Sequence, residues 1–371
     1  MRQVYLDYNA STPIAPEVRQ VMLPLLENDF GNPSAMHQFG KNAKRAVEQA
    51  RTQVADLIGA NPEELIFTGG GTESNNHALK GVYDHYKDRG NHIIITSIEH
   101  PAVIEPCRYL SQNGAKITQV GVDEYGRIDP DEIEHAITED TILISVMHSN
   151  NEVGTIQPIK EIGKLAKERG ILFHTDASQS LGKVEIDVDD LHVDLLTFAG
   201  HKLYAPKGIG ALYIREGVKL SNFMHGAGHE RGLRAGTENV IFAAALGEAC
   251  RLAKENLQQN KEIKQLRDYF WGELKEHFQE KISLNGHPDH RLPNTLNINM
   301  IGRIGQEVLA QLSQVAASTG SACHAGEVTL SPVLSEMGVR EEEGMGAIRF
   351  SLGKYTTKEE IEYVLEHMKK I

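Results

Sequence analysis

Residues 64–76 have the sequence ELIFTGGGTESNN, and this stretch sets the pattern for the rest of the chain. Residues 64–68 are rich in apolar and β-branched side chains and predict a short strand. After the three glycines, the polar and then amphipathic segment to about residue 88 predicts a helix. The alternation continues, with strands expected at 92–97, 116–120, 141–147, 171–175, 193–198 and 209–214, and helices at 102–112, 131–137 and 159–168.

Such alternation of strands and helices predicts an α/β fold with a mainly parallel sheet flanked by helices. In sheets of this kind, ligands bind at the carboxyl ends of the strands. After Thr237 the pattern changes, and a long helical stretch is expected to about Lys281. We interpret its apolar stripe as a packing face, formed by Ile263, Leu266, Phe270, Leu274 and Phe278. A strand at 295–300 and a helix at 357–370 predict a second, smaller α+β domain.

Charge and composition exclude several classes of protein. The 371 residues include 51 acidic and 38 basic ones, a net charge of −13, which works against nucleic acid or an anionic membrane as the main partner. No apolar run has the length of a membrane span, and the first residues, MRQVYLD, place a charge where a signal peptide needs an apolar core. Three cysteines suit a reducing compartment. We therefore expect a cytoplasmic protein, most simply an enzyme.

An aspartate and a lysine lie at the ends of two expected strands. Neither residue alone indicates a function, but the two together do. Asp176 closes one strand, and Lys202 closes another 26 residues later, both behind the glycine run at 69–71. The glycine run alone is equally compatible with a phosphate cradle and with a tight turn. A lysine that forms a Schiff base, a carboxylate that keeps a pyridine nitrogen protonated and a phosphate loop are what pyridoxal 5'-phosphate (PLP) needs. The combination predicts a PLP site.

Cys323 stands apart from the other two cysteines. It lies among small residues in Ser318–Gly326, with His324 beside it to favour a thiolate, and we interpret it as a nucleophile on a loop. Cys107 and Cys250 fall on expected helices and are interpreted as inert core residues.

Two further side chains have two interpretations each. His100 ends a strand and could stack on an aromatic ring and move protons, or could simply bond to the backbone. Arg349 lies in an apolar, strand-like run and needs an anionic partner, either a substrate carboxylate or a structural glutamate. The paired histidines elsewhere lack the spacing of a metal motif, so we expect no metal.

Taken together, these residues resemble the cysteine desulfurases and selenocysteine lyases, PLP enzymes of the class V aminotransferase group. The resemblance runs nearly end to end and rests on the joint order of many motifs. They are YLDYNA (5–10), FGNPS (30–34), GTESNN (71–76), EH (99–100), MHSNNE (147–152), HTDASQ (174–179), GHK (200–202), GHER (228–231), RAGTEN (234–239), GSAC (320–323) and IRFSLG (348–353).

The resemblance implies a role for each matching residue. Lys202 would form the Schiff base, Asp176 would pair with the pyridine nitrogen, His100 would stack on the ring and assist proton transfer, and Gln179 would contact the phenolic oxygen. Cys323 would attack the substrate sulfur. The phosphate would be bound by Gly71, Thr72 and His201 and, from the other subunit of a homodimer, by Thr237. Asn151 would contact both the cofactor and the substrate, and the substrate carboxylate would be bound by Arg349 and Asn32.

The implied fold is the PLP-dependent aspartate-aminotransferase type, with a large domain at about 15–250 and a small domain combining 1–14 with 251–371. The implied reaction converts L-cysteine to L-alanine and leaves a persulfide on Cys323 for an acceptor protein. Iron–sulfur cluster assembly is one possible destination among several. The alternative is a lyase specific for L-selenocysteine. One departure is Ala199, which stands where many members have a phosphate-binding serine.

Overall fold

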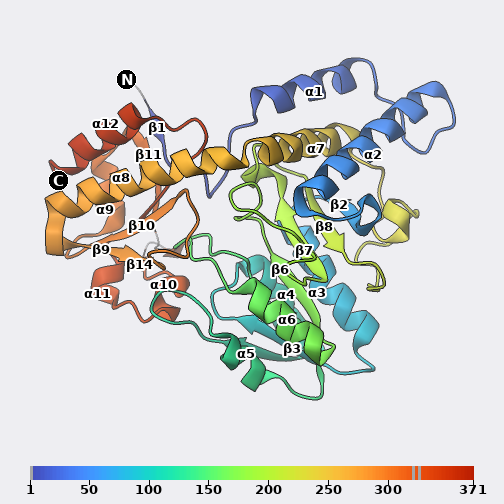
Figure 1. The fold of residues 1–371 in the computed structure, drawn as a ribbon, viewed down its shortest axis with the longest axis horizontal. Helices are drawn as coiled ribbons and strands as arrows, with labels where there is room; N and C mark the ends of the chain where they lie inside the picture. Colours follow the sequence, from blue (N-terminus) through green and yellow to red (C-terminus); the bar gives the residue numbers. More distant parts are fainter. Residues whose placement is uncertain (1–2, 320–321, 325–326) are drawn as a thin grey trace.

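The structure is a computed structural model that describes residues 3–319, 322–324 and 327–371, with side chains left out of the description at 322–324 and 327–328. Within these residues, the largest sheet has seven strands (Figure 1). In spatial order they are β2 (Leu65–Thr68), β8 (Gly210–Ile214), β7 (Leu195–Ala199), β6 (Leu172–Asp176), β5 (Thr141–Ser145), β3 (His92–Thr96) and β4 (Lys116–Val120). The strands from β7 to β4 pair in parallel, and β8 pairs antiparallel with both neighbours. The prediction of a mainly parallel sheet is confirmed.

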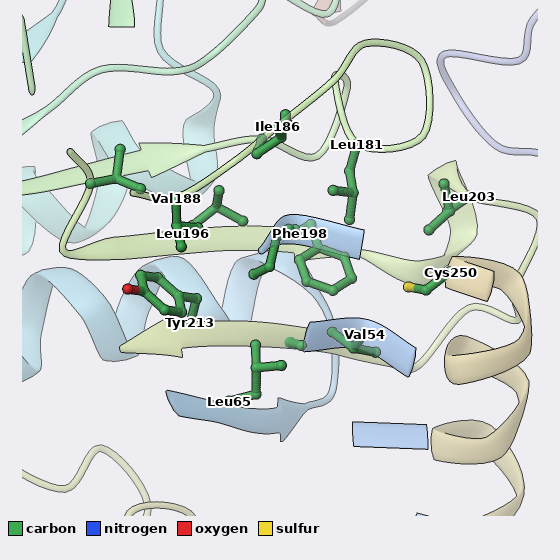
Figure 2. Packing of buried hydrophobic residues seen from close by; sticks show 14 of the residues in the cluster. Val54, Leu65, Leu181, Ile186, Val188, Leu196, Phe198, Leu203, Tyr213 and Cys250 are labelled. Atoms are coloured by element: carbon green, nitrogen blue, oxygen red, sulfur yellow. The ribbon is translucent and has the colours of Figure 1, made fainter. Parts of the chain in front are cut away.

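Helices cover both faces of this sheet, which is why its strands are apolar nearly throughout. One face packs against α3 (Gly71–Tyr86) and α4 (Pro101–Gln112), and the other against the remaining helices of this part. Those are α1 (Pro16–Glu27), α2 (Gln38–Ile58), α5 (Pro130–Ala136), α6 (Ile159–Arg169) and α7 (Val240–Glu255). Figure 2 shows Leu196 and Phe198 of β7 packed near Val54 and Cys250, which come from α2 and α7. Cys107 and Cys250 are both buried, so their interpretation as core residues is confirmed.

The helical stretch expected to about Lys281 is confirmed, but it is divided into two α-helices, a break that the sequence did not predict. α7 ends at Glu255, and α8 (Asn260–Phe278) begins after a short 3-10 turn. The side chain of Asn256 donates to the carbonyl of Leu252 and closes the first helix, while Asn260 donates to the carbonyl of Gly182. The stripe on α8 does pack as expected: Phe270 and Leu274 are buried in the second core, and the other three side chains pack against it.

A smaller sheet lies beside the first in the part drawn at the left of Figure 1. Its strands, in order, are β12 (Ser318–Thr319), β15 (Ala347–Ser351), β10 (Thr295–Met300) and β9 (Ile282–Asn285). β1 (Val4–Tyr5) pairs in parallel with β11 (Val315–Ala316) as a separate two-stranded sheet, and Asp7, just after β1, forms a bridge with Ser351 of β15 that joins the N-terminal segment to this sheet. The other elements here are β13 (Ala322–His324), β14 (Glu327–Thr329), α9 (Gly305–Gln311), α10 (Pro332–Glu336), α11 (Glu341–Gly344) and α12 (Lys358–Met368).

The buried apolar side chains of the described residues form four clusters. Two lie on the two faces of the seven-stranded sheet, within residues 15–250, and a third joins Val4 and Leu6 to residues between Phe270 and Met368. The fourth and smallest packs Ile98, Met147 and Val153 against residues between Val333 and Ala347. We therefore propose two domains, 15–250 and 1–14 with 251–371. Among the described residues, no helix has both the length and the apolar character needed to cross a membrane.

Candidate active site

A cavity of about 340 Å³ lies where the sequence predicted it, at the carboxyl ends of the parallel strands. Its wall combines residues that follow β3, β5, β6 and β7 with the N-terminus of α3 and two residues of the N-terminal segment. They are Asn9, Ala10, Gly71, Thr72, Asn75, His100, Ala102, Met147, Ser149, Asn151, Asp176, Ser178, Gln179, Ala199, His201, Lys202 and Arg349.

Most of the predicted site residues meet in this cavity. Two do not: Asn32 and Thr237 are both exposed and do not line it within the single chain. The side chain of Cys323 lies outside the described residues, and its backbone is part of β13, opposite Val328 of β14. The cavity therefore unites the predicted cofactor and carboxylate ligands, while the positions of two ligands and of the nucleophile's thiol are left as proposals.

Asp176 is held by two donors from different elements. The side-chain amide of Asn75 donates to its Oδ2 at 2.7 Å, and the backbone N–H of Ser178 donates to its Oδ1 at 2.9 Å. Asn75 lies one turn beyond Gly71 on α3, on the face of the helix that packs on the sheet. Within the part of the chain that the structure describes, its Oδ1 is buried without a hydrogen-bond partner. A carboxylate fixed in this way is ready to pair with a protonated ring nitrogen.

Lys202 lies just after β7 and points to the N-terminal segment. Its Nζ donates to the carbonyl oxygens of Asn9 at 2.7 Å and Ala10 at 2.8 Å. Burial and the nearby Arg349 guanidinium lower the pKa of Lys202 to about 8, against the opposing effect of Asp176. The amine therefore reaches its neutral, nucleophilic form at a lower pH than a solvent-exposed lysine does.

The glycine run makes the turn and also opens the helix toward the cavity. Gly70 has φ of 143°, which favours glycine, and α3 begins at Gly71. A Cβ added at Gly71 would come within 3.3 Å of Ser178 Oγ and 3.5 Å of the Ala199 side chain, so the backbone stands close to the cavity wall. The first N–H groups of a helix bind anions, and His201 adds a buried Nδ1 for which the described residues supply no partner. These features fit a phosphate.

The backbone hydrogen bond expected of His100 is confirmed, while its stacking and proton-transfer roles stay predictions. Its Nδ1 accepts from the backbone N–H of Ala102 at 3.0 Å and caps α4, and the ring also lines the cavity. Surrounding protein atoms desolvate the ring and, with the charge of Lys202, lower the pKa of His100 against the opposing effect of Asp176. We infer a neutral imidazole whose Nδ1 is an acceptor, which leaves Nε2 to carry the proton.

Arg349 has an acidic partner, but that partner is not the glutamate named as the structural alternative. Its Nη2 pairs with Asp7 Oδ1 at 2.8 Å, and its Nη1 donates to the carbonyl of Asn151 at 2.9 Å. Its Nε is buried and has no hydrogen-bond partner among the described residues, and the side chain lines the cavity. An arginine has five N–H donors, so a carboxylate can still bind here.

Sequence reasoning missed a polar network behind the cavity. Lys183 Nζ donates to Gln179 Oε1 at 3.0 Å, and Gln179 Nε2 donates to the carbonyl of Asn9 at 3.0 Å. Burial, together with Lys202 and Arg349, lowers the pKa of Lys183 to about 7. The network fixes the orientation of the Gln179 amide. Asn9 and Asn75 lay within quoted motifs, and the spacing of Lys183 four residues after Gln179 was the available signal for a contact.

Comparisons with known proteins agree with one another. The family model described as aminotransferase class-V matches residues 4–364. The protein named "Cysteine desulfurase IscS" from Dictyoglomus turgidum is 48% identical over 375 residues, covering 100% of this chain and 94% of that protein. Two solved structures are also similar. A "NifS-like protein" has a TM-score of 0.94 and 37% identity, covering 100% of this chain and 99% of that one. "SspA in complex with cysteine" has a TM-score of 0.83 and 39% identity, covering 95% and 100%.

Proposed function

The chain belongs to the class-V aminotransferase family, and from this premise we propose that it is a PLP-dependent cysteine desulfurase. It converts L-cysteine to L-alanine and passes the sulfur to Cys323 as a persulfide. The observation that carries the proposal is one cavity in which Lys202, Asp176 and Arg349 meet, in a chain whose full-length relative bears the cysteine desulfurase name. These names also favour cysteine over selenocysteine as the substrate.

The residues around the cavity suit PLP in kind and position. Asp176 would pair with the ring nitrogen, Lys202 would hold the aldehyde carbon, and the ring would lie against His100 and Gln179. The phosphate would take the N-terminus of α3 with Gly71, Thr72 and His201, and Asn151 would also contact the cofactor. When bound, PLP supplies an electron sink for the charge that develops on the substrate Cα.

The chain's own groups hold the substrate and move its protons. The free donors of Arg349 would bind the substrate carboxylate, with Asn151 beside it and Asn32 as a further proposed ligand. Lys202, whose pKa is lowered to about 8 by burial and by Arg349, takes the Cα proton as a neutral amine. His100 holds a proton on Nε2 at the cavity wall, where it can deliver it to the departing fragment.

The sulfur step balances without an added oxidant. The Cys323 thiolate attacks the substrate sulfur, and a sulfur–sulfur bond forms as the Cβ–S bond breaks. The electron pair of that bond stays with Cβ, which takes up a proton and becomes the methyl group of alanine. The transferred sulfur is oxidised to the persulfide level while the carbon is reduced. A later acceptor thiol, in a protein that we leave unidentified, takes the outer sulfur in the cytoplasm.

A homodimer would complete the site. Phe30, Met36 and Phe39 are 76%, 84% and 51% exposed in the single chain, and the rings of Phe30 and Phe39 stack at 5.6 Å. A second copy would cover this apolar surface. In that dimer the exposed Thr237 would reach the phosphate of the partner's site, as the family resemblance implies. Light scattering on the purified protein tests the dimer; a monomer at micromolar concentration contradicts it.

The proposed function is tested by offering L-cysteine and L-selenocysteine to the wild type and to Lys202→Ala. The wild type is expected to form alanine from L-cysteine, and Lys202→Ala to lose both this activity and the absorbance band of the bound cofactor. Activity on L-selenocysteine alone would replace the proposal with the lyase. An unchanged spectrum in Lys202→Ala would show that the cofactor site is wrongly placed.

A further inference from the structure

The segment that carries Cys323 is anchored before and after the cysteine, once to Asp7, which pairs with Arg349, and once to Glu152, the residue after the one whose carbonyl accepts from Arg349. Before it, Ser318 Oγ donates to Asp7 Oδ1 at 2.9 Å. After it, Ser331 Oγ donates to Glu152 Oε2 at 2.5 Å. The sequence motifs singled out Cys323 and Arg349 separately, and neither the motifs nor the reaction assigns a role to these two serines.

At the first anchor, one carboxylate oxygen serves two strands. Asp7 Oδ1 accepts from Ser318 Oγ and also from Arg349 Nη2, at 2.9 and 2.8 Å. Ser318 and Arg349 are directly opposite each other in the antiparallel pair β12–β15, and Asp7 forms a β-bridge with Ser351, two residues after Arg349 on β15. The side chains of Arg349 and Asp7 are only 11% and 19% exposed, so water competes weakly for these contacts.

At the second anchor, the backbone makes the corresponding link. Arg349 Nη1 donates to the carbonyl of Asn151, and the next residue, Glu152, accepts from Ser331. Ser331 also caps α10, so the chain leaves the segment in a fixed direction. Burial raises the pKa of Glu152, against the lowering effects of Ser331 and Arg349. Both ends of the Cys323 segment are thus tied to the two sides of one guanidinium.

We propose that Asp7 and Ser318 are positioning residues that fix the first stem of the Cys323 segment relative to Arg349. This inference rests on the proposed function. L-Cysteine would place its carboxylate at Arg349 and its sulfur at Cys323, so the two protein groups must be kept in register with one small molecule. Because displacements of about 1 Å can slow a reaction about a hundredfold, a hydrogen bond that sets this register acts on the sulfur step.

The test uses the PLP-loaded protein with Ser318→Ala and, as the matched control, Ser318→Thr, which retains the hydroxyl. L-Cysteine is mixed in a single turnover, and persulfide on Cys323 is followed by mass spectrometry. Ser318→Ala is expected to slow persulfide formation about tenfold, since a lost hydrogen bond to a charged group has an effect of this order. The L-cysteine concentration that half-saturates the cofactor's spectral change stays the same, because Arg349 retains Asp7. Ser318→Thr restores the rate to within about twofold of wild type.

Three results would overturn this inference. They are persulfide formation at the wild-type rate in Ser318→Ala, an equal decrease of that rate in both variants, and a decrease accounted for by a higher half-saturating L-cysteine concentration. Failure of the proposed function gives a different result, because the wild type itself then forms no persulfide. In that case hydrogen exchange of the backbone at residues 327–329 decides whether the anchor exists. Faster exchange in Ser318→Ala than in Ser318→Thr supports the anchor, and equal exchange overturns it.

Discussion

The hydrogen bond from Asn75 to Asp176 gives a test of the site that needs neither cofactor nor substrate. Its side-chain amide is fully buried and donates to Asp176 Oδ2 at 2.7 Å, and Asp176 itself is only 8% exposed. Asn75→Ala removes one of the two hydrogen-bond donors to this buried carboxylate. Hydrogen bonds to charged groups contribute about 1.5–3 kcal/mol, so the free energy of unfolding of the cofactor-free protein should fall by about that amount.

The assay is urea unfolding followed by circular dichroism, at one protomer concentration because a dimer would make the transition concentration-dependent. Asn76→Ala is the matched control: Asn76 lies beside Asn75 on the same helix, is less buried and donates to the local carbonyl of Thr72. Asn76→Ala should lower the free energy of unfolding by no more than about 0.5 kcal/mol. Equal destabilisation by the two substitutions would refute the claim that Asp176 depends on Asn75. We also expect weaker PLP binding in Asn75→Ala alone.

Three further predictions concern charge and burial. Burial and Arg349 lower the pKa of Lys202 to about 8, so the amine loses its proton at a lower pH than an ordinary lysine does. The rate at which the cofactor-free protein binds PLP, followed by absorbance, should therefore rise with pH and reach half its maximum near pH 8. A midpoint near pH 10.5 would argue against this. The buried guanidinium of Arg51 donates to both carboxylate oxygens of Glu230, at 2.8 and 3.0 Å. Glu230→Gln removes the negative charge of this pair and should lower the free energy of unfolding by about 3–5 kcal/mol. A decrease of less than about 1 kcal/mol, measured by urea unfolding, would contradict this. Burial raises the pKa of Cys107 to about 12 and raises the pKa of Cys250 as well. Peptide mapping should therefore find neither thiol alkylated by iodoacetamide at pH 8 until the chain is unfolded. Alkylation of either cysteine in the folded protein would be inconsistent with the core packing.

Local patterns predicted the elements whose boundaries are local. The strands at 116–120 and 295–300 have the expected bounds, since apolar or β-branched runs end there at turn residues. The break between α7 and α8 was missed because helical periodicity runs through it. The break depends on Asn256 and Asn260, and the contact of Asn260 with Gly182 is tertiary. Helical spacing alone does not encode such a contact.

The site divides in the same way. Asp176, His100 and Lys202 could be placed because each follows a strand of one parallel sheet, and the topology then brings them together. The acidic partner of Arg349 could not be placed, because Asp7 is 342 residues away and reaches it through a backbone bridge with Ser351 of the same strand as Arg349. The network around Lys183 likewise joins segments that have no common sequence pattern.

Sulfur transfer to Cys323 is the central claim, and one comparison tests it most directly. The PLP-loaded wild type and Cys323→Ala are given L-cysteine side by side, with alanine measured in solution and persulfide measured on the protein. The wild type should form alanine and carry one additional sulfur on Cys323, while Cys323→Ala should retain the cofactor's absorbance and form neither product. Persulfide or alanine formation at the wild-type rate by Cys323→Ala would contradict the account.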